Sequence, residues 1–206
     1  MVAVASMPIA ERAVAFPRVP WKTYVLLRDA IDAPQLKMTY CEGVLELTSP
    51  SEAHELNKSH LARLVELYAF LTGIRVGCYG STTFKSEARE RGVEPDECWR
   101  VEREPTRGQL PHIVLEVIET APLLDKLHVY DGLEVPEVWL LEQGKLFIHR
   151  RKARGGYVKA RRSAFLPDLD PKLLERFLPV ADEVEAQKDF ATRVRGGRKK
   201  PRRRKS

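Results

Sequence analysis

The sequence predicts an α/β fold in which a mixed central β-sheet is flanked by helices. The first observation is an apolar stripe at spacings of three and four residues over 53–71, which is typical of a long helix packed on a core. The second is the run 113–118, whose apolar side chains are interrupted only by Glu116, as in a central strand. Helices are expected before and after this strand-rich middle, which favours a sheet covered by helices.

The long helix is the clearest single element. Ser49, Pro50 and Glu52 fit a capping box with proline in the first turn, which satisfies the unpaired amides at a helix start. Gly73 can end the helix in a left-handed conformation. The other expected elements are a helix over 21–31, a hairpin of 38–40 and 44–47, strands over 74–79, 82–85, 98–101 and 113–118, a helix over 120–131, strands over 138–141, 146–150 and 157–160, and helices over 171–177 and 180–194.

Three segments divide the chain. Residues 1–18 are expected to be a flexible N-terminal arm, and residues 19–192 are expected to form the folded domain. Residues 193–206 are expected to be a disordered basic tail, because the run GGRKKPRRRKS offers nothing to bury in a core. The chain of 206 residues is long enough for one domain with a substantial hydrophobic core.

The composition favours a cytoplasmic protein without a membrane span. No apolar run approaches the ~20 residues that cross a bilayer, and Glu11 and Arg12 interrupt the apolar N-terminus, which argues against a secretory signal. The three cysteines, Cys41, Cys78 and Cys98, are an odd number without CxxC spacing. They fit reduced thiols better than a disulfide framework or a zinc site.

The positive charge lies at the C-terminal end. Residues 193–206 hold nine of the 35 Lys and Arg and no acid, so the other residues carry 26 basic and 29 acidic side chains, a net charge of −3. Residues 150–162 hold seven further Lys and Arg without an acid. These stretches either contact nucleic-acid phosphates or are a solubilising tail and a solvated hairpin. The tail residues expected to bind nucleic acid are Arg198, Lys199, Lys200, Arg202, Arg203, Arg204 and Lys205.

Glu116 and Asp96 are candidate metal ligands. An ionised carboxylate within an apolar strand is costly to desolvate unless a cation compensates it. Asp96 follows a proline at an expected strand start, and its separation of 20 residues from Glu116 suits two neighbouring strands. Two such carboxylates suit Mg²⁺, which prefers oxygen ligands and keeps several waters. The alternatives are an edge-strand glutamate in a salt bridge and an aspartate that caps a turn.

Lys126 is a third candidate residue for a hydrolytic site, together with Asp96 and Glu116. It lies on the helix expected after the central strand, and Tyr130 follows four residues later on the same face. A lysine at this place could orient the attacking water and offset charge on the phosphorus. Taken alone, Lys126 could equally pair with Asp125 or Glu119, so it is the ordered set of two acids and a lysine that favours chemistry.

Several short motifs resemble the Uma-type family of restriction-endonuclease-like proteins. They extend over roughly residues 35–180 and comprise Glu42-Gly43, Pro50 with His54, Glu94-Pro95-Asp96, Leu115-Glu116-Val117, Lys126-xxx-Tyr130, Val135-Pro136-Glu137-Val138-Trp139, Gly156-Tyr157 and Ser163-xx-Phe165-Leu166-Pro167. The resemblance implies a restriction-endonuclease-like fold of the PD-(D/E)XK superfamily. It implies Asp96 and Glu116 as metal ligands and Lys126 as the catalytic lysine, supplied by a helix because Ile118 stands at the usual lysine position.

The resemblance also implies the remaining parts of the site. Glu46 or Glu42 from the preceding hairpin, or His54 on the capped helix, is expected to complete it. Mg²⁺ or Mn²⁺ is the expected cofactor and DNA the expected partner, and a homodimer would suit cleavage of both strands. The chain departs from the family pattern at His112, where an aspartate is common, and at Glu134, where a glycine is common.

The leading hypothesis is a Mg²⁺-dependent endonuclease that hydrolyses the phosphodiester bonds of DNA. The alternative is a non-catalytic nucleic-acid or protein interaction module that keeps the nuclease fold, with salt-sensitive affinity supplied by the basic tail. A third hypothesis is a structural protein whose tail only adds solubility. Metal binding is the simplest observation that separates the first two hypotheses.

Overall fold

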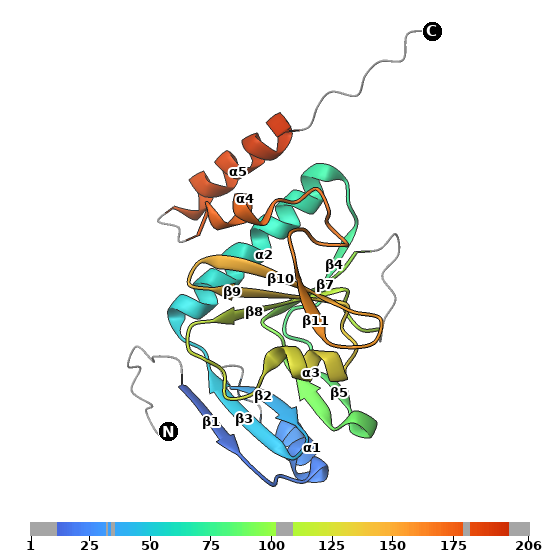
Figure 1. Cartoon of the computed structure of the whole chain (residues 1–206). Coiled ribbons are helices and arrows are strands. Elements are labelled where there is room, and N and C mark those ends of the chain that lie inside the picture. The colour runs from blue at the N-terminus through green and yellow to red at the C-terminus, as the bar shows by residue number, and fades with distance from the viewer. Residues whose placement is uncertain (1–11, 32, 34–35, 102–108, 179–181, 198–206) are drawn as a thin grey trace, which may run out of the picture.

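Two β-sheets organise the chain in this computed structural model, which describes residues 12–31, 33, 36–101, 109–178 and 182–197 (Figure 1). The central sheet has six strands in the order β11-β10-β9-β8-β7-β4, and the N-terminal sheet has five in the order β1-β3-β2-β6-β5. The strands are β1 (Arg12–Phe16), β2 (Lys37–Cys41), β3 (Val44–Ser49), β4 (Val76–Cys78), β5 (Phe84–Ser86), β6 (Arg91–Val93), β7 (Glu97–Val101), β8 (Ile113–Ile118), β9 (Glu137–Glu142), β10 (Lys145–Arg151) and β11 (Tyr157–Ala160). The helices are α1 (Trp21–Ala30), α2 (Glu52–Thr72), α3 (Lys126–Gly132), α4 (Pro171–Glu175) and α5 (Glu183–Gly197), with a 3₁₀ turn at Glu87–Arg89.

The central sheet is mixed and is flanked by helices, so the predicted fold class is confirmed. β8 and β9 are parallel, whereas the other neighbouring strands are antiparallel. Parallel neighbours need a crossover connection, and α3 lies in the connection between these two strands. Figure 1 shows α2, α4 and α5 on one side of the central sheet and α3 on the other side, toward the N-terminal sheet.

Both faces of β8 are buried, which explains its nearly continuous apolar run. Ile113, Leu115 and Val117 belong to the core that includes the apolar residues of α2, α4 and α5. Val114 belongs to a second core, which includes the apolar residues of α3. Side chains alternate along a strand, so Glu116 shares the face of Val114 and is directed toward α3.

The N-terminal sheet has a small aromatic core of its own. Tyr24 on α1 is fully buried against Met38, Tyr40 and Leu45 of the β2–β3 hairpin. The rings of Tyr24 and Tyr40 are stacked, with centroids 4.8 Å apart and planes inclined by 18°. This packing fixes the hairpin, whose β2 and β3 strands also carry residues of the candidate site.

Two strands of the N-terminal sheet differ from the sequence-based prediction. Residues 12–16 were expected to belong to a flexible arm over 1–18, but they form β1, which pairs antiparallel with β3. The side chains of β1 are mostly exposed, so backbone pairing rather than an apolar pattern defines this edge strand. β6 was also not predicted, because Arg91-Gly92-Val93 is too short to show alternation. Residues 1–11 lie outside the described residues.

The C-terminal helix ends later than predicted. α5 continues to Gly197, so Arg193 and Arg195 of the predicted basic tail are helical. The seven candidate nucleic-acid-binding residues of the tail lie in 198–206, outside the described residues. Among the described helices, none combines the length and apolarity that crossing a bilayer requires.

Two helices begin later than the sequence predicts. The N-cap of α2 is Ser51, whose hydroxyl accepts a hydrogen bond from the amide of His54 at 3.1 Å, rather than Ser49. α3 begins at Lys126, after its N-cap Asp125, whose carboxylate accepts hydrogen bonds from the amides of Leu127 and His128. The residues from 120 to 125 are not helical, and the amides of Leu123 and Leu124 instead donate to Glu46 at 2.7 and 2.9 Å.

Replacing Gly92 with alanine should destabilise the N-terminal sheet. A Cβ atom at Gly92 would overlap the hydroxyl of Tyr24, which is fully buried and cannot easily turn away. We expect Gly92→Ala to lower the free energy of unfolding by about 1–3 kcal/mol, the usual cost of overpacking. Gly196→Ala is the matched control, because a Cβ there meets nothing within 4 Å. Equal urea midpoints for the two variants would contradict this view of the core.

Candidate active site

The five side chains proposed from the sequence line one small cavity. Its volume is about 30 Å³. The cavity lies where β3, α2, β8 and the start of α3 converge. The proposed residues that line it are Glu46, His54, Asp96, Glu116 and Lys126.

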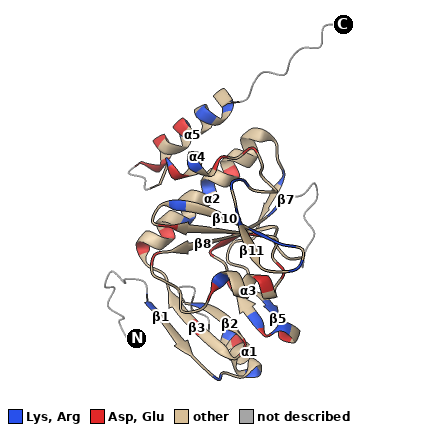
Figure 2. Ribbon diagram, in the orientation of Figure 1, with Lys and Arg blue, Asp and Glu red and all other residues tan. Residues whose placement is uncertain are grey.

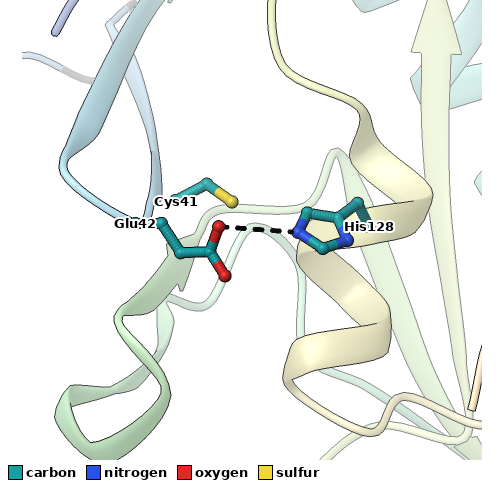
Figure 3. Close-up of side chains that lie close together, drawn as sticks. All are labelled: Cys41, Glu42 and His128. Atoms are coloured by element: carbon teal, nitrogen blue, oxygen red, sulfur yellow. Dashed lines mark ion pairs between the residues drawn. The ribbon is translucent and has the colours of Figure 1, made fainter.

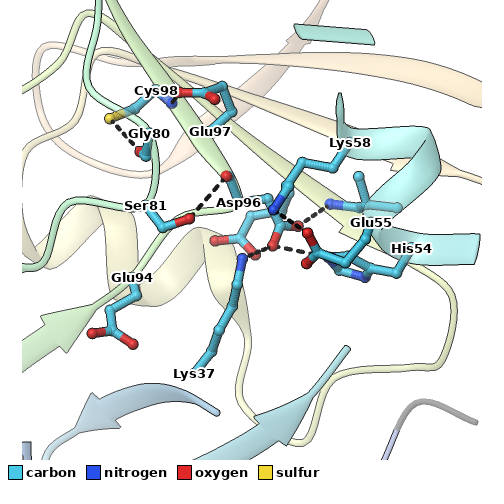
Figure 4. Close-up of polar contacts among 12 residues, drawn as sticks. Lys37, His54, Glu55, Lys58, Gly80, Ser81, Glu94, Asp96, Glu97 and Cys98 are labelled. Atoms are coloured by element: carbon cyan, nitrogen blue, oxygen red, sulfur yellow. Dashed lines mark hydrogen bonds and ion pairs between the residues drawn. The ribbon is translucent and has the colours of Figure 1, made fainter. Parts of the chain in front are cut away.

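Asp96 is held rigidly at the start of β7. Its amide donates to the carbonyl of Leu115 on the neighbouring β8 at 3.1 Å, and the residue is 2% exposed. The ammonium of Lys37 and His54 Nε2, which lies at 2.9 Å, both contact Oδ1, as Figure 4 shows. Oδ2 accepts from the amide of Val117 at 2.6 Å. Burial alone would raise the pKa of Asp96, but Lys37 and His54 together lower it below its ordinary value.

Glu116 faces the same cavity from the middle of β8. The phenol of Tyr130 donates to Oε1, and Lys126 Nζ lies 3.5 Å from Oε2. Burial raises the pKa of Glu116, Lys126 offsets part of that effect, and the negative charge of Asp96 adds to it. The two carboxyl groups therefore differ in environment, because Asp96 has strong donors while Glu116 remains poorly compensated.

Lys126 joins the two sheets at the cavity. As the first residue of α3, it donates to the hydroxyl of Thr39 on β2 at 3.0 Å and lies near Glu116 and Glu46. Burial alone would lower the pKa of Lys126, but Glu116, Glu46 and Asp96 together raise it. The side chain is therefore an ammonium ion at neutral pH.

Glu46 on β3 is the third acid of the cavity. It is 1% exposed, and its Oε2 accepts from the amides of Leu123 and Leu124. Its Oε1 makes no hydrogen bond within the part of the chain that the structure describes, and it lies 3.9 Å from Lys126 Nζ. A buried carboxylate oxygen that accepts no hydrogen bond destabilises the folded protein unless a further partner binds it.

The donor set fits a divalent cation such as Mg²⁺ or Mn²⁺. The charged side chains that line the cavity include three carboxylates and two lysines. Carboxylate oxygens are the ligands that Mg²⁺ prefers, and the free oxygen of Glu46 and Oε2 of Glu116 lie 3.9 and 3.5 Å from the same Lys126 Nζ. Asp96 and Glu116 would hold the ion, with Glu46 as a third acid.

Comparison with known proteins identifies the family of the chain. Residues 21–185 match the model of the Uma2 family, which is described as "putative restriction endonuclease". The chain belongs to the Uma2 family. A crystal structure of a protein from Anabaena variabilis, described as a "putative nuclease belonging to DUF820", resembles this chain with a TM-score of 0.49 and 13% identity, covering 78% of this chain and 99% of the other. No curated protein matches the chain. The family predicted from the sequence is thus confirmed.

In this Uma2 protein, a separate cluster of potential metal ligands lies around the guanidinium of Arg91. The ligand atoms of Cys41, Glu42 and His128 lie within 4.8 Å of one another (Figure 3). The guanidinium of Arg91 donates to Glu42 at 2.7 Å and lies 3.0 Å from His128 Nε2. Burial raises the pKa of Cys41, which disfavours the thiolate that a metal needs. The cluster is a charge network around Arg91, and Glu42 therefore does not serve the cavity.

Glu94, which belongs to a family motif, and His112, which departs from the family pattern, have structural roles outside the cavity. Glu94 pairs with Arg28 and accepts from the hydroxyl of Thr83 at 3.0 Å. His112, at the departure from the family pattern, stacks on Phe165 with ring centroids 4.6 Å apart. Neither residue lines the cavity, so the replacement at His112 leaves the ligand set intact.

Sequence reasoning missed three contributors to the site. Lys37 and Thr39 lie on β2 and were not singled out, and Tyr130 was noted only for its spacing from Lys126. The i, i+4 spacing of Lys126 and Tyr130 was the available signal, since it places both on the face that meets Glu116. Lys37 offered no such signal, because it is 59 residues away from Asp96.

Tyr130→Phe should cost more stability than Tyr157→Phe. The phenol of Tyr130 donates to a buried carboxyl group, whereas that of Tyr157 donates to the neutral carbonyl of Val135 at 2.6 Å. Hydrogen bonds to charged groups contribute ~1.5–3 kcal/mol and neutral ones ~0.5–1.5 kcal/mol. Urea unfolding of the two variants measures the difference. A larger loss for Tyr157→Phe would contradict the charged environment assigned to Glu116.

Proposed function

We propose that this Uma2 protein is a metal-dependent endonuclease that hydrolyses phosphodiester bonds in DNA. The observation that carries the proposal is the convergence of Asp96, Glu116 and a charged Lys126 on one buried cavity. Membership of a family described as restriction endonucleases supports the same reaction class. The fit of the carboxylates to Mg²⁺ or Mn²⁺ supports the metal dependence.

Each residue has a distinct task in this mechanism. A bound divalent cation would activate a water and stabilise the leaving oxygen. The amide of Val117 and His54 fix the position of Asp96. Tyr130 orients Glu116 in the same way. Lys126 places a positive charge beside the carboxylates, where it can orient the attacking water and offset the charge that develops on the phosphate.

Basic segments supply candidate contacts to the DNA backbone. The β10–β11 hairpin carries exposed Lys and Arg, and Figure 2 shows Lys and Arg positions in blue along this edge of the central sheet. The nine basic residues of 193–206 add a second positive segment to a body of net charge −3. Such segments give affinity that depends on salt and not on sequence, which suits the holding of a DNA strand.

The proposal predicts metal-dependent nicking that Lys126 supports. Supercoiled plasmid should be nicked in Mg²⁺ or Mn²⁺ and remain intact in EDTA. Lys126→Met should reduce the rate ~10²–10³-fold, as the loss of a charge-stabilising group usually does, and Asp96→Asn should abolish it. Lys145→Met is the control, because that lysine is exposed and pairs with Glu175 at 3.3 Å.

Two results would count against the enzyme. Nicking that persists at full rate in Lys126→Met would exclude the mechanism described above. Binding of Mn²⁺ and DNA by a wild-type protein that never nicks would favour the non-catalytic interaction module.

Deletion of 198–206 should weaken DNA binding without affecting folding. The deletion removes seven cationic side chains, and each phosphate contact contributes ~0.9 to the slope of log K against log [salt]. The slope should therefore become shallower by up to about 6. The thermal midpoint should stay unchanged, because the sequence of 198–206 offers no apolar side chain that a hydrophobic core would bury apart from Pro201. An unchanged slope would show that the tail does not contact phosphate.

A further inference from the structure

Lys37 links the candidate active site to a larger cavity. It is the first residue of β2, and its ammonium contacts Oδ1 of Asp96 (Figure 4). The same side chain lines both the small cavity of the site and an adjoining cavity of about 520 Å³. That volume lies within the ~300–1,000 Å³ that is typical of ligand pockets. Lys37 therefore borders both the candidate active site and a cavity large enough for a ligand.

The oxygens of Asp96 are already occupied in this structure. Oδ2 accepts from the amide of Val117, which belongs to β8 and cannot leave without breaking the sheet. Oδ1 is contacted by His54, which is 3% exposed, and by Lys37. Among these donors, Lys37 alone has a long flexible stem and an open cavity beside it. A cation that binds Asp96 would therefore displace Lys37 most readily.

We propose that Lys37 is a further active-site residue with two alternating partners. Without metal it is the counter-ion of Asp96, and a divalent cation displaces it from Oδ1. The displaced ammonium then binds a phosphate of the nucleic-acid strand at the mouth of the larger cavity. This inference rests on the proposed metal-dependent function, because the displacing cation belongs to it.

The other cations of the larger cavity already have partners. Arg28 pairs with Glu94, and Lys58 pairs with Glu55. Once released from Asp96, the ammonium of Lys37 would add an unpaired positive charge to the lining of the larger cavity. Phosphodiester oxygens supply the opposite charge, and lysine binds phosphate as a flexible point charge. A phosphate is therefore the chemical group that the released side chain fits.

Titration calorimetry with Mn²⁺ tests the displacement. Lys37→Met removes both the competitor and its positive charge, so it should bind Mn²⁺ about tenfold more tightly or better, because nearby charges interact strongly in a protein interior. Lys37→Arg should stay near the wild type, since it keeps a competing cation. Lys58→Met is the matched control, because it lines the same large cavity without contacting Asp96.

Three outcomes would overturn the displacement. They are unchanged or weaker binding of Mn²⁺ by Lys37→Met, an equal gain in Lys58→Met, and a gain in Lys37→Arg as large as that in Lys37→Met. If Lys37→Met is too unstable for calorimetry, the rise of its thermal midpoint on adding Mn²⁺ gives the same answer. That rise should exceed the wild-type rise, and a smaller rise would overturn the proposal.

Binding of a labelled DNA duplex tests the second partner. The Lys126→Met background slows cleavage enough for binding to be measured, and affinity is determined with and without Mn²⁺. Adding Lys37→Met should reduce the affinity about 3–10-fold with Mn²⁺ and leave it unchanged without the metal. An equal loss in both conditions, or no loss in either, would overturn the phosphate contact. A wild type that binds no Mn²⁺ would overturn the proposed function together with this inference, whereas normal Mn²⁺ binding without an effect of Lys37 would overturn the inference alone.

Discussion

The burial of charge where the two sheets meet constrains the rest of the structure. Glu46, Asp96 and Glu116 are each at most 4% exposed, and a carboxylate in such a place loses several kcal/mol of hydration unless opposite charges and donors replace the water. Lys37 and Lys126 provide the opposite charges, and backbone amides of β8 and of the segment before α3 provide donors. The relative positions of these elements therefore depend on polar contacts as much as on apolar packing.

The N-terminal sheet provides part of this charge compensation. The central sheet supplies Asp96 and Glu116 on adjacent strands, but the contacts that compensate them come partly from β2 and β3, which carry Lys37, Thr39 and Glu46. The aromatic packing of α1 on these two strands holds the hairpin in place. A small second sheet thus completes a site that the larger sheet begins.

The sequence identifies the residues whose roles depend on local pattern. Glu116 stands out because it interrupts an apolar run, and Asp96 because it precedes the paired strand. Lys37 and Thr39 do not stand out, because their partners lie 59 and 87 residues away in the sequence. The edge strand β1 and the short strand β6 were missed for a related reason, since pairing with β3 and β2 defines them rather than their own alternation.

The cavity can compensate its carboxyl groups in two ways. Without metal, the ammonium ions of Lys37 and Lys126 oppose the carboxyl groups of Asp96, Glu116 and Glu46. A divalent cation held by Asp96 and Glu116 would supply the opposite charge in place of Lys37, which would then become superfluous to the cavity. Desolvated charge is tolerated only when it is compensated, and Lys37 contacts the Oδ1 of Asp96 that a cation would bind, so the two cations compete for Asp96. The same restriction explains why the displaced lysine needs an anion outside the cavity, which a nucleic-acid phosphate provides.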